Sequence, residues 1–131
     1  MMDIKISNMS SVPIYQQVAT QIKSSILNGS LKCNDQLPSI RSLSKELEVG
    51  IITVKKSYEV LLQEELIYSK GAVGYFVNDI DLATVLYIKR EEYLVELKVI
   101  IDRAINDGLN IEDIKDIVDK VLEEKIYDKS E

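Results

Sequence analysis

The chain has 131 residues, of which 46% are hydrophobic and 29% charged, and its formal net charge is −6. This composition fits one compact unit or two small ones and excludes disorder, and the absence of an apolar run of eighteen residues or an export leader predicts a cytoplasmic protein without a membrane span. One cysteine, Cys33, excludes an internal disulfide, and without histidine a Cys/His zinc site is impossible, so we expect no metal and no cofactor.

The first expected helix covers residues 13–28, from a proline to the residue before Gly29. Apolar residues recur along it every four positions, which predicts a helix with one face in a core. These residues are Ile14, Val18, Ile22 and Ile26. Residues 30–38 follow as a loop.

Two further helices are expected around a turn of about three residues, Glu48 to Gly50. The second helix opens with an N-cap hydroxyl at Ser39 and carries one apolar face. In the third helix the inward positions recur with helical period. They are Val54, Ser57, Tyr58, Leu61 and Leu62. Helices joined so tightly cross steeply, as in a helix-turn-helix.

A β-hairpin is expected next, because two β-rich runs, residues 66–70 and 75–77, flank a turn that contains two glycines. The segment from Asp79 to Gly108 then reads as a long helix of about 40 Å, and Asn110 caps a last one. The predicted fold is mainly α (α+β). It is a winged helix-turn-helix domain over residues 11–78, followed by a two-helix dimerisation tail over residues 79–131.

Each tail helix carries an apolar stripe that it cannot bury alone. The stripe residues that we expect to dimerise are Leu82, Leu86, Tyr93, Leu97, Ile100, Ile114, Val118 and Val121. We therefore predict a homodimer. The carboxylates of the last helix follow its opposite face, which is the ordinary pattern of a solvated surface and argues against an enzyme.

Negative charge is concentrated in the tail. Residues 1–78 hold eight Lys or Arg against seven Asp or Glu, a net of about +1, whereas residues 79–131 hold eight against fifteen, a net of about −7. The first segment is therefore free to present a local basic face.

Three places in the first segment are candidates for DNA contact. The start of the second helix offers backbone N–H groups for phosphate, the outer face of the third fits a major groove, and the hairpin glycines allow close approach. The candidate residues are Ser39, Arg41, Ile52, Thr53, Lys55, Lys56, Lys70, Gly71 and Gly74. Instead of contacting DNA, the lysines could be ordinary surface residues of a solvated helix. The glycines could be present only because the turn needs positive φ.

The runs PIYQQVATQIKSSILNGSL, LPSIRSLSKELEVGIITVKKSYEVLLQEELI and KGAVGYFV resemble the DNA-binding domain of the GntR family of bacterial transcription regulators, over residues 12–78. The short helical tail is similar to that of the YtrA subfamily, in which two helices dimerise. The resemblance implies the DNA-contact residues named above, a dimer on an inverted-repeat operator, and repression of an adjacent, possibly transporter, operon. It does not identify an effector.

The chain departs from the family pattern at Gly50-Ile51, where Ser-Arg or Asn-Pro is common, and at Tyr75, where a small residue is frequent. Without that arginine, base recognition is expected to depend more on Arg41, Lys55, Lys56 and the hairpin. The competing hypothesis is a helix-turn-helix used as a protein-interaction module, whose acidic tail binds a basic partner.

Overall fold

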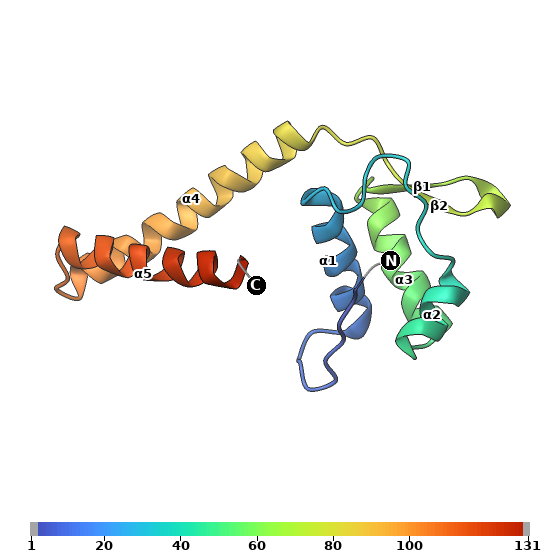
Figure 1. The fold of residues 1–131 in the computed structure, drawn as a ribbon, viewed down its shortest axis with the longest axis horizontal. Coiled ribbons are helices and arrows are strands. Elements are labelled where there is room, and N and C mark those ends of the chain that lie inside the picture. The colour runs from blue at the N-terminus through green and yellow to red at the C-terminus, as the bar shows by residue number, and fades with distance from the viewer. Residues whose placement is uncertain (1–2, 130–131) are drawn as a thin grey trace. The chain divides into compact units, whose positions relative to one another are not determined.

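The computed structural model describes residues 3–129 and divides the chain into two compact units, Met1–Ala83 and Thr84–Glu131 (Figure 1). The first unit holds three α-helices and a two-stranded antiparallel sheet with a 3₁₀ turn, and two long helices follow. In chain order the elements are α1 (Ile14–Leu27), α2 (Ile40–Leu47), α3 (Ile51–Gln63), β1 (Ile67–Ser69), η1 (Gly71–Val73), β2 (Tyr75–Val77), α4 (Leu82–Asn106) and α5 (Ile111–Lys129). The predicted winged helix-turn-helix with a helical tail is confirmed.

One hydrophobic core holds the first unit together, because α1 and α2 both pack on α3 and the two strands close its end. The predicted inward faces are buried except for the half-buried Ile14 and Leu62, and Val54, Tyr58 and Leu61 are fully inaccessible to solvent. The buried apolar residues are Val18, Ala19, Ile22, Ile26, Leu37, Leu43, Val54, Tyr58, Leu61, Leu66, Ile67 and Val77. Burying a side chain of this size contributes about 1.5–3 kcal/mol.

The turn between α2 and α3 is closed by left-handed backbone at Glu48, with φ 56° and ψ 43°. Ser44, which is buried, donates its hydroxyl to the Val49 carbonyl, and the Val49 amide donates to the Ser44 carbonyl at 3.1 Å. This reciprocal pair fixes the direction in which α3 leaves the turn.

The hairpin, here called the wing (residues 67–77), is wider than the sequence indicated. β1 pairs with β2 in the register Ile67 to Val77, and the loop before α2 adds a short third edge to β2. The Asn34 amide donates to the Val77 carbonyl at 2.8 Å, and the Leu37 amide donates to the Tyr75 carbonyl at 2.9 Å. The wing is therefore bonded to the segment that leads into α2.

The N-terminal segment lies against α1, although its sequence gave no such indication. The Gln21 side chain accepts from the Lys5 amide at 2.9 Å and donates to the Lys5 carbonyl at 2.6 Å. Gln17 does the same with the amide and carbonyl of Ser7, at 2.9 and 3.0 Å. The two glutamine side chains thus bind the backbone N–H and C=O groups of this segment, as the backbone of a neighbouring β-strand would.

The long helix α4 begins three residues later than predicted. Residues 79–81 are not helical, because the Asn78 side chain donates to the Glu65 carbonyl at 3.0 Å and accepts from the Asp79 amide at 2.9 Å. Ile80 then packs against the core of the first unit. These contacts keep residues 79–81 out of the helix, which begins at Leu82.

The last helix begins at the predicted cap. Asn110 accepts from the Asp113 amide at 2.9 Å, and the Asp113 carboxylate accepts from the Asn110 amide at 3.0 Å, which is a reciprocal capping box. Across residues 3–129, no helix combines the length and hydropathy that a bilayer crossing requires.

Candidate nucleic-acid interface

The start of α2 is built as a capped helix end. The Ser39 hydroxyl oxygen accepts from the Ser42 amide at 3.1 Å, which leaves the hydroxyl proton and the other first-turn N–H groups available to a ligand. Arg41 follows in the first turn with its side chain exposed. A guanidinium beside a helix N-terminus is suited to a phosphate, because the planar fork and the backbone N–H groups both donate.

The start of α3 exposes both apolar and cationic side chains. Ile52 is 82% exposed, Thr53 is half-buried, and Lys55 and Lys56 are exposed. The Lys56 ammonium lies 4.1 Å from the centre of the Tyr15 ring, on α1. Lys56 is therefore in contact with the neighbouring helix, whereas Lys55 lies over no aromatic ring in the described part of the chain.

The wing turn holds both of its glycines at positive φ, but only Gly74 has a backbone conformation that excludes other residues. Gly71 has φ +53° and Gly74 has φ +134° with ψ −159°, a combination that is open essentially only to glycine. The Lys70 ammonium lies 5.2 Å from the centre of the Phe76 ring, and Val73 at the tip is 65% exposed. Both glycines therefore have the positive φ that the alternative explanation requires. Positive φ at these positions is also compatible with close approach of the backbone to a nucleic acid.

The structure groups some of the candidate residues and separates others. In Figure 1, α2 and the tip of the wing both extend on the side of α3 that faces away from α1. Lys56, held on Tyr15, lies on the α1 side. Within residues 3–129 the cations of Arg41, Lys55, Lys56 and Lys70 form no ion pair, so their charge is available to a polyanion.

Tyr58, on α3, connects this helix to the segment before α2 and to β2 of the wing. It is fully buried on α3, its hydroxyl donates to the Pro38 carbonyl at 2.7 Å, and its ring meets the Tyr75 ring edge-on at 5.1 Å. Burial raises the pKa of the Tyr58 phenol above its ordinary value, and Tyr75 adds to the shift. Periodicity placed Tyr58 in the core, but it could not identify Pro38 as the acceptor that a buried phenol requires.

A second side-chain contact at the wing was also not foreseen. The Tyr68 hydroxyl donates to the Asn34 side chain at 2.7 Å, and the Tyr68 ring stacks on Phe76 with ring centres 5.7 Å apart. The only signal in the sequence was the pair of aromatic residues in the two β-rich runs, which sit opposite each other in the observed register.

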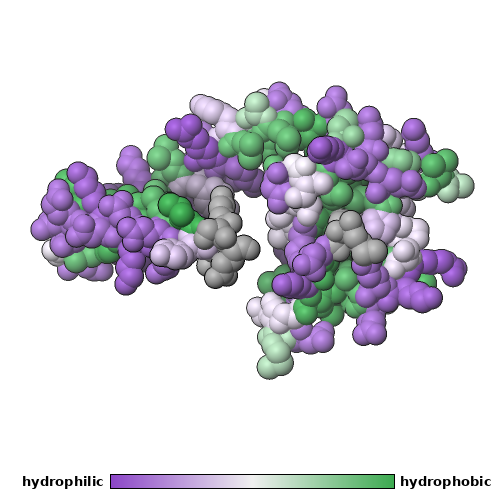
Figure 2. All heavy atoms as spheres, viewed as in Figure 1, coloured by the Kyte–Doolittle hydropathy of each residue, from purple (hydrophilic) through white to green (hydrophobic). Residues whose placement is uncertain are grey.

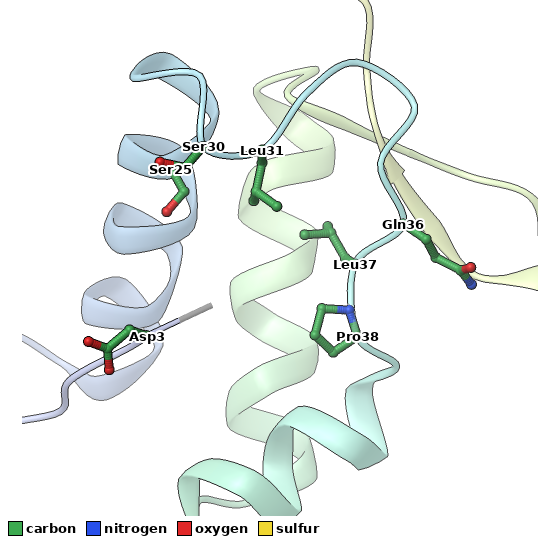
Figure 3. A pocket seen from close by; sticks show the side chains of 7 residues that line it. All are labelled: Asp3, Ser25, Ser30, Leu31, Gln36, Leu37 and Pro38. Atoms are coloured by element: carbon green, nitrogen blue, oxygen red, sulfur yellow. The ribbon is translucent and has the colours of Figure 1, made fainter. Parts of the chain in front are cut away.

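A hollow of about 620 Å³ lies beside these elements (Figure 3). Its lining combines an apolar floor with hydroxyl, amide and carboxylate groups. The lining residues are Asp3, Ser25, Ser30, Leu31, Gln36, Leu37 and Pro38. None of the candidate DNA-contact residues lines it, so it is a separate feature of the first unit.

The tail helices leave most of their predicted stripes exposed, although Leu82 and Ile114 are half-buried. Between α4 and α5 runs a groove of about 420 Å³ whose lining is entirely apolar. It is lined by Leu97, Ile100, Ile101, Ala104, Ile114, Ile117, Val118, Val121 and Leu122. Nearer the N-terminus of α4, Leu86 and Tyr93 are also exposed. Figure 2 shows hydrophobic side chains at the surface of the tail between hydrophilic ones. The two tail helices do not cover this surface by themselves.

Comparison with known proteins agrees with these features. The family model described as "Bacterial regulatory proteins, gntR family" matches residues 14–77. The HTH-type transcriptional repressor YtrA of Bacillus subtilis is 30% identical over 118 residues, which are 90% of this chain and 91% of that protein.

Two solved structures extend the comparison. The GntR-family transcription factor YtrA from Sulfolobus acidocaldarius is 38% identical, with a TM-score of 0.57 over 70% of this chain and 97% of the other. The DNA-binding domain of AraR, solved in complex with its operator ORX1, is 26% identical, with a TM-score of 0.52 over 58% and 95%. Both relatives named YtrA are matched over more than nine-tenths of their length.

Proposed function

Because the chain belongs to the GntR family of bacterial transcriptional regulators, which are not enzymes, we propose that it binds an inverted-repeat operator as a homodimer and represses transcription. The contacts are assigned to the starts of α2 and α3 and to the wing. The proposed residues are Ser39, Arg41, Ile52, Thr53, Lys55, Lys56, Lys70, Gly71 and Gly74.

The observation that carries this proposal is the set of unpaired cations at these three places. The chain is acidic overall, yet no carboxylate of residues 3–129 pairs with Arg41, Lys55 or Lys70, and these cations lie on elements that a duplex can meet together. AraR supports the proposal, since its DNA-binding domain shares the fold and was solved with operator DNA. The exposed Ile52 is suited to the methyl group of thymine.

The apolar groove of the tail supports the homodimer. Covering this apolar groove with another apolar surface removes it from water, which is favourable. A second copy of the chain, related by two-fold symmetry, provides such a surface. A two-fold dimer presents two α3 helices to two half-sites, which predicts an operator with inverted-repeat symmetry. Like charges on the tails oppose assembly only weakly, since exposed charges are screened beyond about 8 Å at physiological salt.

Repression follows from occlusion of a promoter, and the relative named as the repressor YtrA supports it. By the family resemblance, we assign the protein to the cytoplasm and its operator to an adjacent operon, with a transport operon as the first to test. The assignment to a domain over residues 11–78 and a dimerisation tail over 79–131 belongs to the same proposal.

A helix-turn-helix that binds only protein is the alternative, and salt dependence separates the two. Binding to a duplex of the DNA immediately upstream of the gene is measured by fluorescence anisotropy at several salt concentrations, with scrambled DNA of the same length as competitor. We expect the logarithm of the affinity to fall with log salt by about 0.9 for each phosphate contacted.

Arg41→Ala should weaken this binding, and Arg103→Ala, which removes an exposed arginine from α4, is the matched control. Footprinting of the same duplex then locates the inverted repeat. If the upstream duplex binds no better than scrambled DNA at low salt, or if Arg41→Ala binds like the wild type, the DNA interface assigned above is wrong.

A further inference from the structure

Gln36 stands between two of the places proposed to contact DNA. Its backbone is bridged to Phe76 of β2, and Ser39, the N-cap of α2, follows three residues later. Figure 3 shows its side chain directed away from Leu31 and Leu37, toward the wing. The Gln36 amide nitrogen donates to the Val73 carbonyl at the tip of the wing at 3.0 Å.

The tip has few other bonds to fix it. Within the turn, the Val73 amide donates to the Lys70 carbonyl at 3.0 Å, and the Lys70 amide donates to the Gly74 carbonyl at 2.8 Å. Both are internal to residues 70–74 and cannot fix the tip relative to α2. Among residues 3–129, the hydrogen bond of the Gln36 side chain is thus the one from outside the wing that reaches the tip.

Gly74 is adapted to this contact. A Cβ at Gly74 would lie 3.0 Å from the Gln36 amide nitrogen, so a larger residue would displace the side chain that holds the tip. The bond also spans 37 residues of sequence, and it joins the segment that sets the start of α2 to the turn that carries Lys70.

We propose that Gln36 is a positioning residue for DNA binding. It sets the place of the wing tip relative to the N-terminus of α2, so that the cations of Lys70 and Arg41 meet one duplex at a fixed spacing. This inference rests on the proposed function. A tip released from Gln36 populates other positions, and the apparent affinity falls by the fraction of molecules that keep the competent one.

The test compares Gln36→Met with Gln63→Met. Methionine keeps the length of glutamine and adds no charge, but it cannot donate to the Val73 carbonyl. Gln63 is exposed at the end of α3, with no side-chain hydrogen bond among those of the described residues, so the same substitution there controls for the loss of a surface amide.

The first measurement needs no DNA. Amide hydrogen exchange of the Lys70 and Val73 amides should accelerate by about 2- to 10-fold in Gln36→Met, as expected for the loss of one exposed hydrogen bond. The Asn78 amide, which donates to the Leu66 carbonyl at 3.0 Å just below the base of the wing, should exchange as in the wild type. Unchanged exchange at the tip overturns the inference.

The second measurement uses the upstream duplex. Gln36→Met should bind it about 2- to 10-fold more weakly, and the salt slope should become shallower by about one phosphate contact, a change that a purely structural role would not produce. Lys70→Ala should weaken the wild type but add little in the Gln36→Met background, because the tip contact is already lost.

The outcomes separate this inference from the proposed function. If the wild type binds with the expected salt dependence and Gln36→Met binds equally well, the role of Gln36 is overturned and the proposed function stands. If the wild type itself fails to bind the duplex, both fail, while the exchange data still decide whether Gln36 holds the tip.

Discussion

The hydroxyl of Tyr58 on α3 donates a 2.7 Å hydrogen bond to the carbonyl oxygen of Pro38, the residue immediately before the N-cap of α2. The same ring meets Tyr75 of β2. One fully buried side chain therefore contacts the start of α2 and the wing, while it belongs to the helix proposed to enter the groove. The relative positions of the three elements depend on it.

Tyr58→Phe should lower the free energy of unfolding by about 1–3 kcal/mol, because it removes the hydroxyl and leaves the Pro38 carbonyl without that donor. Urea denaturation measures the loss. Tyr87→Phe, at a tyrosine that is 63% exposed on α4, is the matched control and should change stability by less than about 0.5 kcal/mol. Equal effects of the two substitutions would contradict a special role for the buried hydroxyl.

Alkaline pH should destabilise the fold through the same residue. Burial raises the pKa of Tyr58 in the folded state, so the unfolded chain loses this phenolic proton at lower pH than the folded chain does. The stabilising contribution is complete below the ordinary tyrosine value of about 10 and is lost as pH rises from there toward the raised pKa. Unfolding free energies measured across this range should fall more steeply for the wild type than for Tyr58→Phe, and parallel curves would exclude the coupling.

Sequence reasoning succeeded where a local rule decides the structure. The four-residue spacing of Val18, Ile22 and Ile26 gave the buried face of α1, and the caps at Ser39 and Asn110 gave the starts of two helices. Each of these depends on residues within a turn or two of one another. Helical period and capping preferences are therefore sufficient to predict them.

It was insufficient where a side chain meets a distant part of the chain. Gln17 and Gln21 look like ordinary polar positions of α1, yet they bind the backbone of residues that the sequence left unassigned. Asn78 delays the start of α4 in the same way, through a carbonyl 13 residues earlier. Such bonds depend on the tertiary arrangement, which no local pattern encodes.

The two lysines of α3 should differ in their contribution to DNA binding. Lys55→Ala should weaken binding to the upstream duplex and reduce the salt slope by about one contact. Lys56→Ala should have a smaller effect on the slope, because its ammonium lies on the Tyr15 ring, and should instead reduce stability by about 0.5–1 kcal/mol. Anisotropy titrations and urea denaturation of both variants check this, and the reverse order would make Lys56 the stronger of the two DNA contacts.

The two glycines of the wing should respond differently to substitution. Gly74→Ala should destabilise the first unit by about 1–3 kcal/mol, since φ +134° with ψ −159° is strained for any residue with a Cβ. Gly71→Asn should cost less than about 1 kcal/mol, because φ +53° is a left-handed value that asparagine tolerates and a Cβ there meets nothing within 4 Å. Denaturation midpoints compare them, and equal losses would mean that backbone strain at Gly74 is not the cause.

The tail offers a test of the homodimer with a control two residues away. Leu97 lines the apolar groove, whereas Val99 lies about 200° around α4 from it and is comparably exposed in the single chain, at 60% against 48%. Leu97→Asp places a carboxylate in a surface that the dimer would bury, which costs several kcal/mol unless the charge is paired. The dissociation constant of the Leu97→Asp dimer should rise by about 100-fold or more, while the Val99→Asp variant should remain dimeric.

Sedimentation equilibrium at micromolar concentration distinguishes the two variants, and circular dichroism confirms that both keep their helices. A wild type that sediments as a monomer would exclude the homodimer altogether. Dimers in both variants would move the interface away from the groove between α4 and α5, and monomers in both would show that any added charge on α4 is sufficient. Dissociation of Leu97→Asp alone should also abolish tight binding to the inverted repeat, because a monomer reaches only one half-site.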